Sequence, residues 1–342
     1  MTRNLRSLFA VLLAGLAPGV TLATPAPAQN LMPVTMCVFD MLGANGPTHK
    51  ALRGYQTDAI SWGASITFKS FTDERVAAEA FNQGTCDLVN LPGIRARSYN
   101  SFTGSMEAIG AIPTYQHMRM ILATLAGEKA APLMRQGDYE IVGISPIGAL
   151  YGFVTDRSID SPKKLAGKKI TVLDNAPESQ YLVEQTGLTP VSSTISNAIQ
   201  KFNNKSVDIT GAPALAFEPL EMTKGLEPNG GIWQWPILQT SLQFVARWQK
   251  LPEGFAAHSR VYIHNATEGL FKLIAVNEAA IPAKYWISLS DDLKEEWAET
   301  FRKNRIALRD KGIYDGKALS LFRKVRCSVD AERSECTAAD KE

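Results

Sequence analysis

The sequence predicts an α/β fold of two lobes, each built on a mainly parallel β-sheet flanked by helices, with a ligand cleft between them. The order strand, helix, strand, helix, strand occurs twice along the chain, and this order gives a parallel sheet with right-handed crossovers. Removal of a predicted leader leaves about 310 of the 342 residues, a length for which two domains are the better expectation.

The leader has the features of a secretory signal peptide over residues 1–28. Arg3 and Arg6 precede an apolar run over 8–14, and Ala26-Pro27-Ala28 matches the small-residue cleavage pattern. The run is far shorter than the about 20 residues that a membrane-spanning helix needs. We therefore expect cleavage near Ala28 and a mature protein in the periplasm.

The elements of the first lobe follow from hydrophobic periodicity and helix-end signals. Thr72 is the expected N-cap of a helix with Asp73 and Glu74 in its first turn, and Gly84 is expected to end that helix in the left-handed conformation. Strands are predicted over 34–39, 65–71 and 86–91, with a further helix over 48–60.

The second lobe repeats this order. The segment 81–88 (FNQGTCDL) resembles 202–209 (FNNKSVDI), and both stand at a helix end that leads into the third strand, as expected for two similar lobes. Strands are predicted over 169–173, 188–191 and 207–210, with helices over 179–186 and 196–203.

Four cysteines lie beyond the leader, and in an oxidising compartment an even number suggests two disulfides among three pairings. We favour Cys37 with Cys86, which fall in predicted neighbouring strands, and Cys327 with Cys336, which are close in a polar tail over 327–342. Four unpaired buried cysteines are the alternative. The spacings match no zinc-ligand pattern, so no metal is expected.

Composition and motifs exclude other classes of function. The chain is 45% hydrophobic and 20% charged with a net charge of +2, and therefore lacks the basic balance of a nucleic-acid-binding protein. None of the four histidines, His49, His117, His258 and His264, forms an H-E-x-x-H site. Residues 143–148 do not form a G-x-S-x-G nucleophile turn, and 43–46 lack the Lys-Ser/Thr of a phosphate loop. We expect neither catalysis nor a cofactor.

Two open parallel sheets that face each other place the carboxyl ends of their strands at one crevice, where α/β folds bind ligands. The cleft is therefore expected to be lined by residues that follow Phe39, Asn90, Leu173 and Thr210.

Several motifs resemble those of the tripartite ATP-independent periplasmic (TRAP) transporter binding proteins of the DctP type. The segment 156–170 (DRSIDSPKKLAGKKI) is similar to the family's connection between lobes, and 187–191 (GLTPV) to the strand after it. Further similarities are AIQ at 198–200 with VD at 207–208, and VN at 276–277 with WISLSDDL at 286–293, which opens a long C-terminal helix. The likeness is best over about 150–310. It implies a two-lobed, type II-like binding-protein fold and a divergent member of that family.

The departures from the family concern its ligand clamp. Members carry an arginine after the K-I pair that takes a ligand carboxylate in two hydrogen bonds, but Thr171 stands there in this chain. A further arginine and an asparagine of the family align with Tyr151 and Ala212. Because a buried carboxylate without donors is costly to desolvate, we expect a neutral, aromatic or partly apolar ligand, or an acid held differently.

The candidate ligand contacts follow from the cleft and from these departures. Arg95 and Arg97 are the best replacement anion contacts, with two solvated surface arginines as the alternative. Tyr151, Trp233 and Trp235 could stack on a flat ligand, but packing at a lobe crossing is preferred for the tryptophans. Asp40 is as well suited to cap the turn after the first strand as to meet ligand. The full set is Phe39, Asp40, Asn45, Asn90, Arg95, Arg97, Tyr151, Thr171, Asp174, Asn175, Ala212, Trp233 and Trp235.

The resulting hypothesis is a binding protein whose lobes close on the ligand by a hinge at two crossings, near 148–155 and 233–238. The closed protein then hands its ligand to a TRAP-type membrane permease. Lobe I is expected over 29–149 and 237–285, and lobe II over 150–236 and 286–326. The competing hypothesis keeps the same fold in a periplasmic sensor or in an accessory protein of an efflux system. A monomer is expected in either case.

Overall fold

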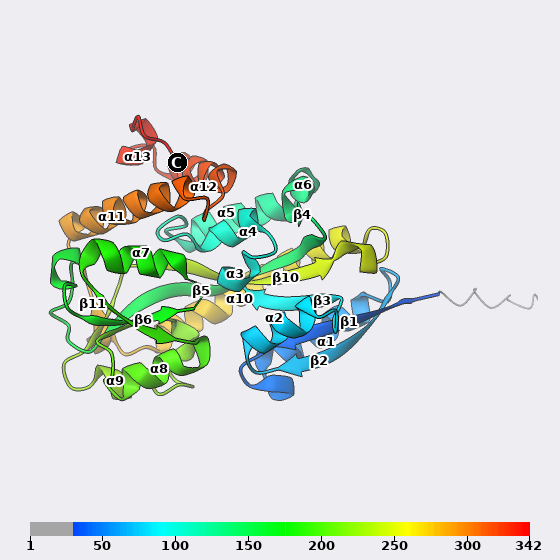
Figure 1. The fold of residues 1–342 in the computed structure, drawn as a ribbon, viewed down its shortest axis with the longest axis horizontal. Helices are drawn as coiled ribbons and strands as arrows, with labels where there is room; N and C mark the ends of the chain where they lie inside the picture. The colour runs from blue at the N-terminus through cyan, green and yellow to red at the C-terminus, as the bar shows by residue number, and fades with distance from the viewer. Residues whose placement is uncertain (1–29, 175) are drawn as a thin grey trace, which may run out of the picture. The chain divides into compact units, whose positions relative to one another are not determined.

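The computed structural model describes residues 30–174 and 176–342; the predicted signal peptide and the candidate residue Asn175 lie outside this part. Eight strands form one hydrogen-bonded path in the order β2-β1-β3-β10-β5-β8-β6-β7. The side built on β1–β3 is lobe I and the side built on β6–β8 is lobe II (Figure 1). The strands are β1 Met32–Phe39, β2 Ala64–Phe71, β3 Leu88–Pro92, β5 Tyr139–Val154, β6 Lys169–Leu173, β7 Thr189–Ser193, β8 Ile209–Pro213 and β10 Leu238–Arg247.

Within each lobe the sheet is parallel, as the repeated strand and helix order predicts. Strand β1 pairs in parallel with β2 and β3, and β6 pairs in parallel with β7 and β8. The bounds of β6 coincide with the predicted range 169–173, and the remaining predicted strands overlap the observed ones.

Two long strands join the lobes, so the sheets of the two lobes are continuous. Two distinct sheets were expected. The long strands β5 and β10 pair antiparallel with each other, β10 also pairs with β3, and β5 also pairs with β8. The path of hydrogen bonds is continuous because both crossings extend across the lobe boundary. The register of the β5–β10 pair shifts between Thr240 and Ser241. Thr240 pairs with Gly148, whose φ of +133° is readily adopted only by glycine.

Helices cover both faces of the sheet. Helices α1–α6 pack around lobe I, α7–α9 belong to lobe II, and α10 runs behind the crossing strands (Figure 1). Their bounds are α1 Pro47–Asp58, α2 Glu74–Asn82, α3 Gly93–Ala96, α4 Ser101–Gly104, α5 Tyr115–Ala126, α6 Ala131–Met134, α7 Pro177–Thr186, α8 Ile195–Asn203, α9 Thr223–Leu226, α10 Phe255–Ala280, α11 Asp291–Asp310, α12 Gly316–Val329 and α13 Ser334–Thr337. Two short strands, β9 Gly231–Trp233 and β11 Trp286–Ile287, pair with each other, and β4 Arg135–Gln136 pairs with β5.

The helix-end signals hold with one correction. Helix α2 is capped by Asp73, whose carboxylate accepts a hydrogen bond from the Arg75 N–H at 2.8 Å, so the prediction of Thr72 is wrong by one residue. Carboxylates cap helices at least as well as hydroxyls, and Asp73 also pairs with the Arg75 side chain. Gly84 adopts φ of +75° after this helix, as expected.

Alternation along the strands fills cores on both faces of the sheet. In β1, Val34, Met36 and Val38 pack on one side, while Cys37 and Phe39 join a second cluster on the other. That second cluster includes Leu319 and Phe322 of α12, so this helix packs with lobe I. Helix α11, which belongs to the same predicted span 286–326, packs beside α7 of lobe II. The assignment of that span to lobe II stays a prediction.

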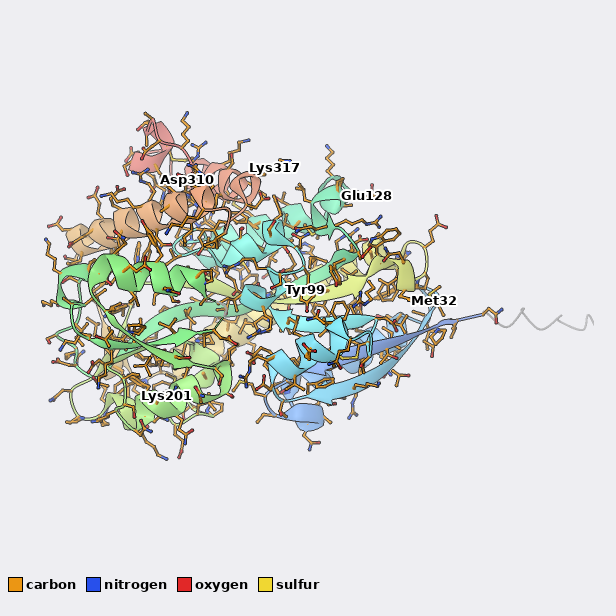
Figure 2. All side chains as sticks on the ribbon, viewed as in Figure 1. Met32, Tyr99, Glu128, Lys201, Asp310 and Lys317 are labelled. Atoms are coloured by element: carbon orange, nitrogen blue, oxygen red, sulfur yellow. A yellow bond between two sulfur atoms is a disulfide. The ribbon has the colours of Figure 1, made fainter. Side chains whose placement is uncertain are left out.

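Both favoured disulfides are present. Cys37 of β1 is joined to Cys86 ahead of β3, and Cys327 of α12 is joined to Cys336 of α13. The exposed faces of α11 and α12 carry charged side chains, among them Asp310 and Lys317 (Figure 2). Among the helices that the structure describes, none is long and apolar enough to cross a bilayer.

The segment 327–342 is polar in sequence but is not a loose tail. The carboxylates of Glu335 and Glu342 are buried, and they pair with the equally buried guanidinium groups of Arg305 and Arg326. Arg326 Nε lies 2.7 Å from Glu335 Oε1, and Arg326 Nη2 lies 2.7 Å from Glu342 Oε2. These pairs and the Cys327–Cys336 bond hold the segment against α11 and α12.

Candidate functional site

A cavity of about 310 Å³ lies between the lobes, at the carboxyl ends of the strands. Lobe I contributes Phe39 at the end of β1 and Pro92 at the end of β3. Lobe II contributes Leu173 at the end of β6 and the end of β8 over 211–213. The parallel strands of both lobes thus point their carboxyl ends at one space, which is the place predicted from the strand order.

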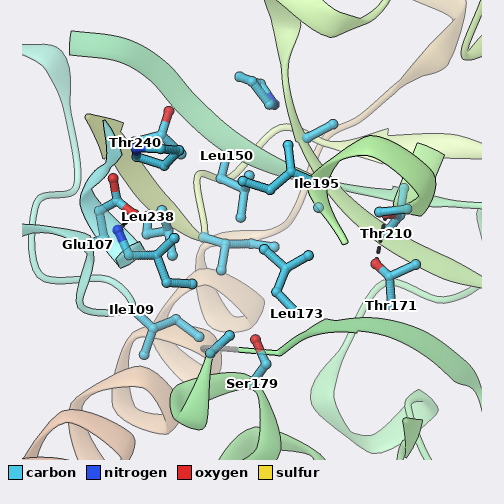
Figure 3. Close-up of a pocket in the computed structure, with 18 of the residues that line it drawn as sticks. Glu107, Ile109, Leu150, Thr171, Leu173, Ser179, Ile195, Thr210, Leu238 and Thr240 are labelled. Atoms are coloured by element: carbon cyan, nitrogen blue, oxygen red, sulfur yellow. Dashed lines mark hydrogen bonds between the residues drawn. The ribbon is translucent and has the colours of Figure 1, made fainter. Parts of the chain in front are cut away.

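The wall of this cavity is mainly aliphatic. Ile109, Leu150, Leu173, Ile195 and Leu238 line it from several different elements (Figure 3). Its polar side chains are Glu107, Thr171, Glu178, Ser179, Thr210, Thr240 and Ser241. No Lys, Arg or His is among the described residues that line it. The cavity therefore offers a ligand hydroxyl groups and apolar surface.

The two threonines on lobe II bond to each other. Thr171 of β6 and Thr210 of β8 stand on adjacent strands, and their hydroxyl oxygens are 2.8 Å apart (Figure 3). A hydroxyl has one proton and two lone pairs, so the pair keeps acceptor capacity for a ligand donor. Thr171 is the residue that aligns by sequence with the arginine of the resembled family.

Glu107 is the one buried carboxylate on the lobe I wall, and backbone donors surround it. It accepts hydrogen bonds from the N–H groups of Gly93, Ile94 and Ser241 at 3.1, 2.8 and 2.7 Å, and from the Ser241 hydroxyl at 3.0 Å. Burial raises the pKa of Glu107 to about 7, against the lowering effect of these hydrogen bonds. Glu107 thereby ties the start of α3 to the crossing strand β10.

Arg97 forms an ion pair across the cleft with Glu178. Arg97 caps the end of α3 on lobe I, and Glu178 lies in the first turn of α7 on lobe II. Arg97 Nη1 and Nη2 donate to Glu178 Oε2 and Oε1, both at 2.9 Å, with only 10% and 5% of the two side chains exposed. Burial opposes the charge of Arg97, but the hydrogen bonds and charge of Glu178 outweigh it, so the pKa of Arg97 is raised.

Arg95 makes a second contact across the cleft. Its Nη2 group lies 3.0 Å from Asp174 Oδ1 on lobe II and 3.2 Å from Glu74 Oε1 on lobe I. The alternative of two solvated surface arginines is wrong, because Arg95 and Arg97 are mostly buried and paired with carboxylates of this chain. Their role as anion contacts for a ligand stays a prediction.

Four of the predicted contact residues line the cavity: Phe39, Thr171, Ala212 and Trp233. Trp233 also packs against Trp297 with ring centroids 5.1 Å apart, and its indole N–H donates to the Ile159 carbonyl at 2.6 Å, so it is fixed as part of the wall. Asp174 meets Arg95 at the rim, with 47% of its side chain exposed.

The remaining predicted residues serve other purposes. Asp40 accepts hydrogen bonds from the N–H groups of Leu42, Thr48 and His49 and thus caps the turn and α1. The Asn90 amide bonds to both the N–H and the carbonyl of Phe39 at 2.9 Å, and Asn45 is exposed.

The aromatic residues Tyr151 and Trp235 are also outside the cavity lining. Leu150 lines the cavity, and its neighbour Tyr151 therefore points to the opposite face of β5, where its hydroxyl donates to Glu278 at 2.7 Å. Trp235 lines a separate surface hollow next to α11. Neither side chain is placed to stack on a ligand in the cavity.

Sequence reasoning missed Glu107, Glu178 and most of the aliphatic wall. Glu107 stands in a single 3-10 turn over Ser105–Glu107, where no motif marks it. Glu178 lies in the first turn of a helix, where the helix dipole favours acidic residues in general, so its sequence position gives no sign of a role in binding. Among the described residues, no group of three or more His, Cys, Asp and Glu side chains is placed to hold a metal ion.

The sequence profile of the family described as "Solute-binding protein AdeT 1/2" matches residues 59–341. The chain is also 38% identical over 304 residues to the probable solute-binding protein AdeT1 of Acinetobacter baumannii, covering 89% of this chain and all of the relative. This chain belongs to the AdeT1/2 family of solute-binding proteins. The probable solute-binding protein AdeT2 of the same organism is 28% identical over 233 residues, or 68% of this chain and 98% of the relative. Members of the AdeT1/2 family are solute-binding proteins and not enzymes.

Solved structures agree on the fold of this AdeT1/2 member. A TRAP periplasmic solute-binding protein from Ralstonia eutropha with bound (S)-2-acetolactate superposes with a TM-score of 0.69 at 13% identity, over 87% of this chain and 99% of the other. One from Desulfovibrio salexigens with bound orotic acid gives 0.66 at 14% identity, over 87% and 99%. The two-lobed TRAP binding-protein fold predicted from the sequence is thus confirmed.

Proposed function

We propose that this AdeT1/2 member is a periplasmic binding protein that captures a small, uncharged and largely apolar organic molecule between its lobes and delivers it to a TRAP-type membrane permease. The observation that carries the proposal is the aliphatic cavity at the carboxyl ends of the strands, which both lobes line and which no Lys, Arg or His among the described residues enters. Its volume of about 310 Å³ falls at the small end of ligand sites, which hold roughly 300–1,000 Å³.

The charge of the ligand follows from the polar groups of the wall. The similar structures named above hold organic acids, acetolactate and orotic acid. In this chain, a buried ligand carboxylate would lose its hydration without gaining a free cation, and it would face the carboxylates of Glu107 and Glu178. A ligand ammonium would fare little better, because Glu107 already accepts four hydrogen bonds and Glu178 is paired with Arg97. An uncharged ligand avoids both costs.

Entry and release of the ligand require the lobes to separate. Met41 of lobe I and Leu215 of lobe II line the cavity and are also 40% and 41% exposed, so they stand where it meets solvent. Bending at Gly148 and at the register shift near Thr240 is the proposed hinge movement. A ligand that contacts both walls favours the closed arrangement by contacts that the open one lacks.

Export to the periplasm rests on the predicted signal peptide. Two arginines, an apolar run and the A-x-A site support cleavage near Ala28, and the two disulfides are typical of an oxidising compartment.

A periplasmic sensor or an accessory protein of an efflux system is the second candidate. It is favoured by Thr171, Tyr151 and Ala212 at the positions where the TRAP binding proteins carry ligand-binding residues, because loss of that clamp would accompany a change of role. Neighbouring genes separate the candidates: a two-part permease favours uptake, a histidine kinase favours sensing and a tripartite pump favours efflux.

The test of ligand class is a thermal-shift screen of the chain without residues 1–28 against small molecules grouped by charge. Ligand at about 100 times its dissociation constant stabilises the folded state by roughly 2.7 kcal/mol, and we expect uncharged apolar compounds to give the hits. Leu173→Trp should abolish them by filling the cavity. Leu42→Trp is the matched control, because Leu42 is 67% exposed and does not line the cavity. Hits confined to acids, or hits that Leu173→Trp leaves unchanged, would contradict the proposal.

A further inference from the structure

The guanidinium of Arg97 is held in a fixed position, as an anion-binding group must be. Its charged face lies 5.3 Å from the ring centroid of Tyr314. A Cβ atom on Gly104 would come within 2.4 Å of Arg97 Cα, so the backbone at Arg97 is closely packed and cannot shift easily. Two nitrogens of the fork face lobe II, where the two oxygens of Glu178 meet them at 2.9 Å. Arginine frequently binds a carboxylate in this two-point geometry.

Glu178 connects this anion site with the cavity. It is 4% exposed and lines the cavity together with its neighbours Ala176 and Ser179. Arg97 itself is not part of the lining. Of the two residues of this ion pair, Glu178 thus belongs to the wall of the cavity and Arg97 does not.

We propose that Glu178 is a built-in counter-ion that occupies the carboxylate site of Arg97 and thereby determines that the cavity accepts uncharged ligands. This inference rests on the proposed function, since it concerns the same cavity. With Glu178 in place, a ligand carboxylate finds the guanidinium already neutralised and meets a negative charge instead. Without it, Arg97 is a buried cation that requires an external anion, because an unpaired buried charge is strongly unfavourable.

The pair also joins the two lobes directly. In a protein that relies on the ligand's carboxylate, the bound acid would supply this link between lobes. Here the link comes from within the chain, and Arg95 with Asp174 adds a second one at the more exposed rim.

The test is chemical rescue of Glu178→Ala by acetate. This substitution removes a CH2–COO⁻ group, and acetate matches that group in size and charge. We expect Glu178→Ala to have a lower unfolding midpoint than the wild type. Sodium acetate should restore at least half of the loss, compared with sodium chloride at equal ionic strength, while acetamide should restore none of it.

Three controls separate ligand exchange from general stabilisation. The wild type should show no acetate effect beyond that of chloride, because its site is filled. Glu178→Gln, which keeps the shape of the side chain, should not be rescued. Arg97→Ala combined with Glu178→Ala should not be rescued either, since the guanidinium is gone. Equal acetate effects in all variants, or no effect in Glu178→Ala, would overturn the proposal.

A chain-length series tests the connection to the cavity. In Glu178→Ala, hexanoate should bind more tightly than acetate by up to about fourfold for each methylene group buried in the aliphatic cavity. Equal affinities would overturn the idea that Glu178 separates Arg97 from the ligand space. These results are independent of the screen of the wild type: rescue with an empty screen would leave the counter-ion intact and refute the proposed function alone.

Discussion

The carboxylate of Glu107 accepts hydrogen bonds from both the N–H and the hydroxyl of Ser241, at 2.7 and 3.0 Å. One residue belongs to a short turn of lobe I and the other to the crossing strand β10, so this contact fixes the cavity wall to a connector between the lobes.

The first prediction concerns the pH dependence that Glu107 gives to stability. Burial raises its pKa to about 7, above the value of about 4.5 for an unfolded chain, so the folded state holds this proton more tightly. The contribution is fully present below about pH 4.5 and is lost as pH rises through about 7, a change on the order of 3 kcal/mol. Urea unfolding of Glu107→Gln should show a weaker decline over this window than the wild type. The exposed Glu218→Gln is the matched control, and an unchanged slope in Glu107→Gln would contradict the assignment.

The second prediction has the opposite sign and concerns Glu335. Burial alone would raise its pKa, but the hydrogen bonds and charge of Arg326, with Arg305 and Arg333, lower it to about 2. Its contribution is present above the unfolded value near 4.5 and is lost as pH falls toward 2. Glu335→Gln should therefore destabilise the protein by about 3 kcal/mol at pH 7, as expected for a broken buried pair, and by much less near pH 2. If the stability difference between the wild type and Glu335→Gln were the same near pH 2 as at pH 7, the prediction would be contradicted.

The third prediction separates the energy of the cross-cleft pair from its role in binding. Arg97→Met alone should cost about 3 kcal/mol, because it leaves the Glu178 carboxylate buried without a partner. The double substitution Arg97→Met with Glu178→Leu should recover most of that loss, since two apolar side chains replace the pair without an unpaired charge. Denaturant unfolding of the single and double variants provides the measurement. A double variant at least as unstable as Arg97→Met alone would contradict the prediction, because the loss would then come from the missing ion pair and not from an unpaired buried charge.

The fourth prediction compares the disulfides. Cys37–Cys86 closes a segment with a sequence separation of 49, and Cys327–Cys336 one of 9. Loop entropy gives about 4 kcal/mol for the first bond and about 2.5 kcal/mol for the second. Paired Cys→Ala variants should lower the unfolding free energy in that order, with a larger loss for Cys37–Cys86 because both residues are also buried. A larger loss for the short loop would indicate that the bond near the Glu335 cluster matters through the ion pairs instead.

Much of the fold follows from local patterns in the sequence. The range predicted for β6 agrees with the structure because its apolar run is bounded by lysines on one side and by the polar Asp174 on the other. Gly84 follows a helix because only glycine adopts its φ readily. The cleft at the carboxyl ends of the strands follows from the strand order alone.

Contacts between distant residues could not be predicted in this way. The lobe II partners of Arg95 and Arg97 stand 79 and 81 residues further along the chain, and nothing near the arginines indicates them. The side of β5 on which Tyr151 lies depends on a single-residue alternation, and an alignment with another family does not reveal which neighbour faces the cavity. The return of α12 to lobe I likewise depends on how two helices pack after the turn that joins them.

The most direct test of the account compares an acid with its uncharged counterpart on the same hydrocarbon body. The affinities of a carboxylic acid and the corresponding primary alcohol for the wild-type protein are measured by calorimetry at neutral pH, with the hydrocarbon taken from the screen. The account predicts that the alcohol binds at least tenfold more tightly, because the aliphatic cavity accepts it while Glu178 already holds the guanidinium of Arg97. Equal affinities, or tighter binding of the acid, would contradict it.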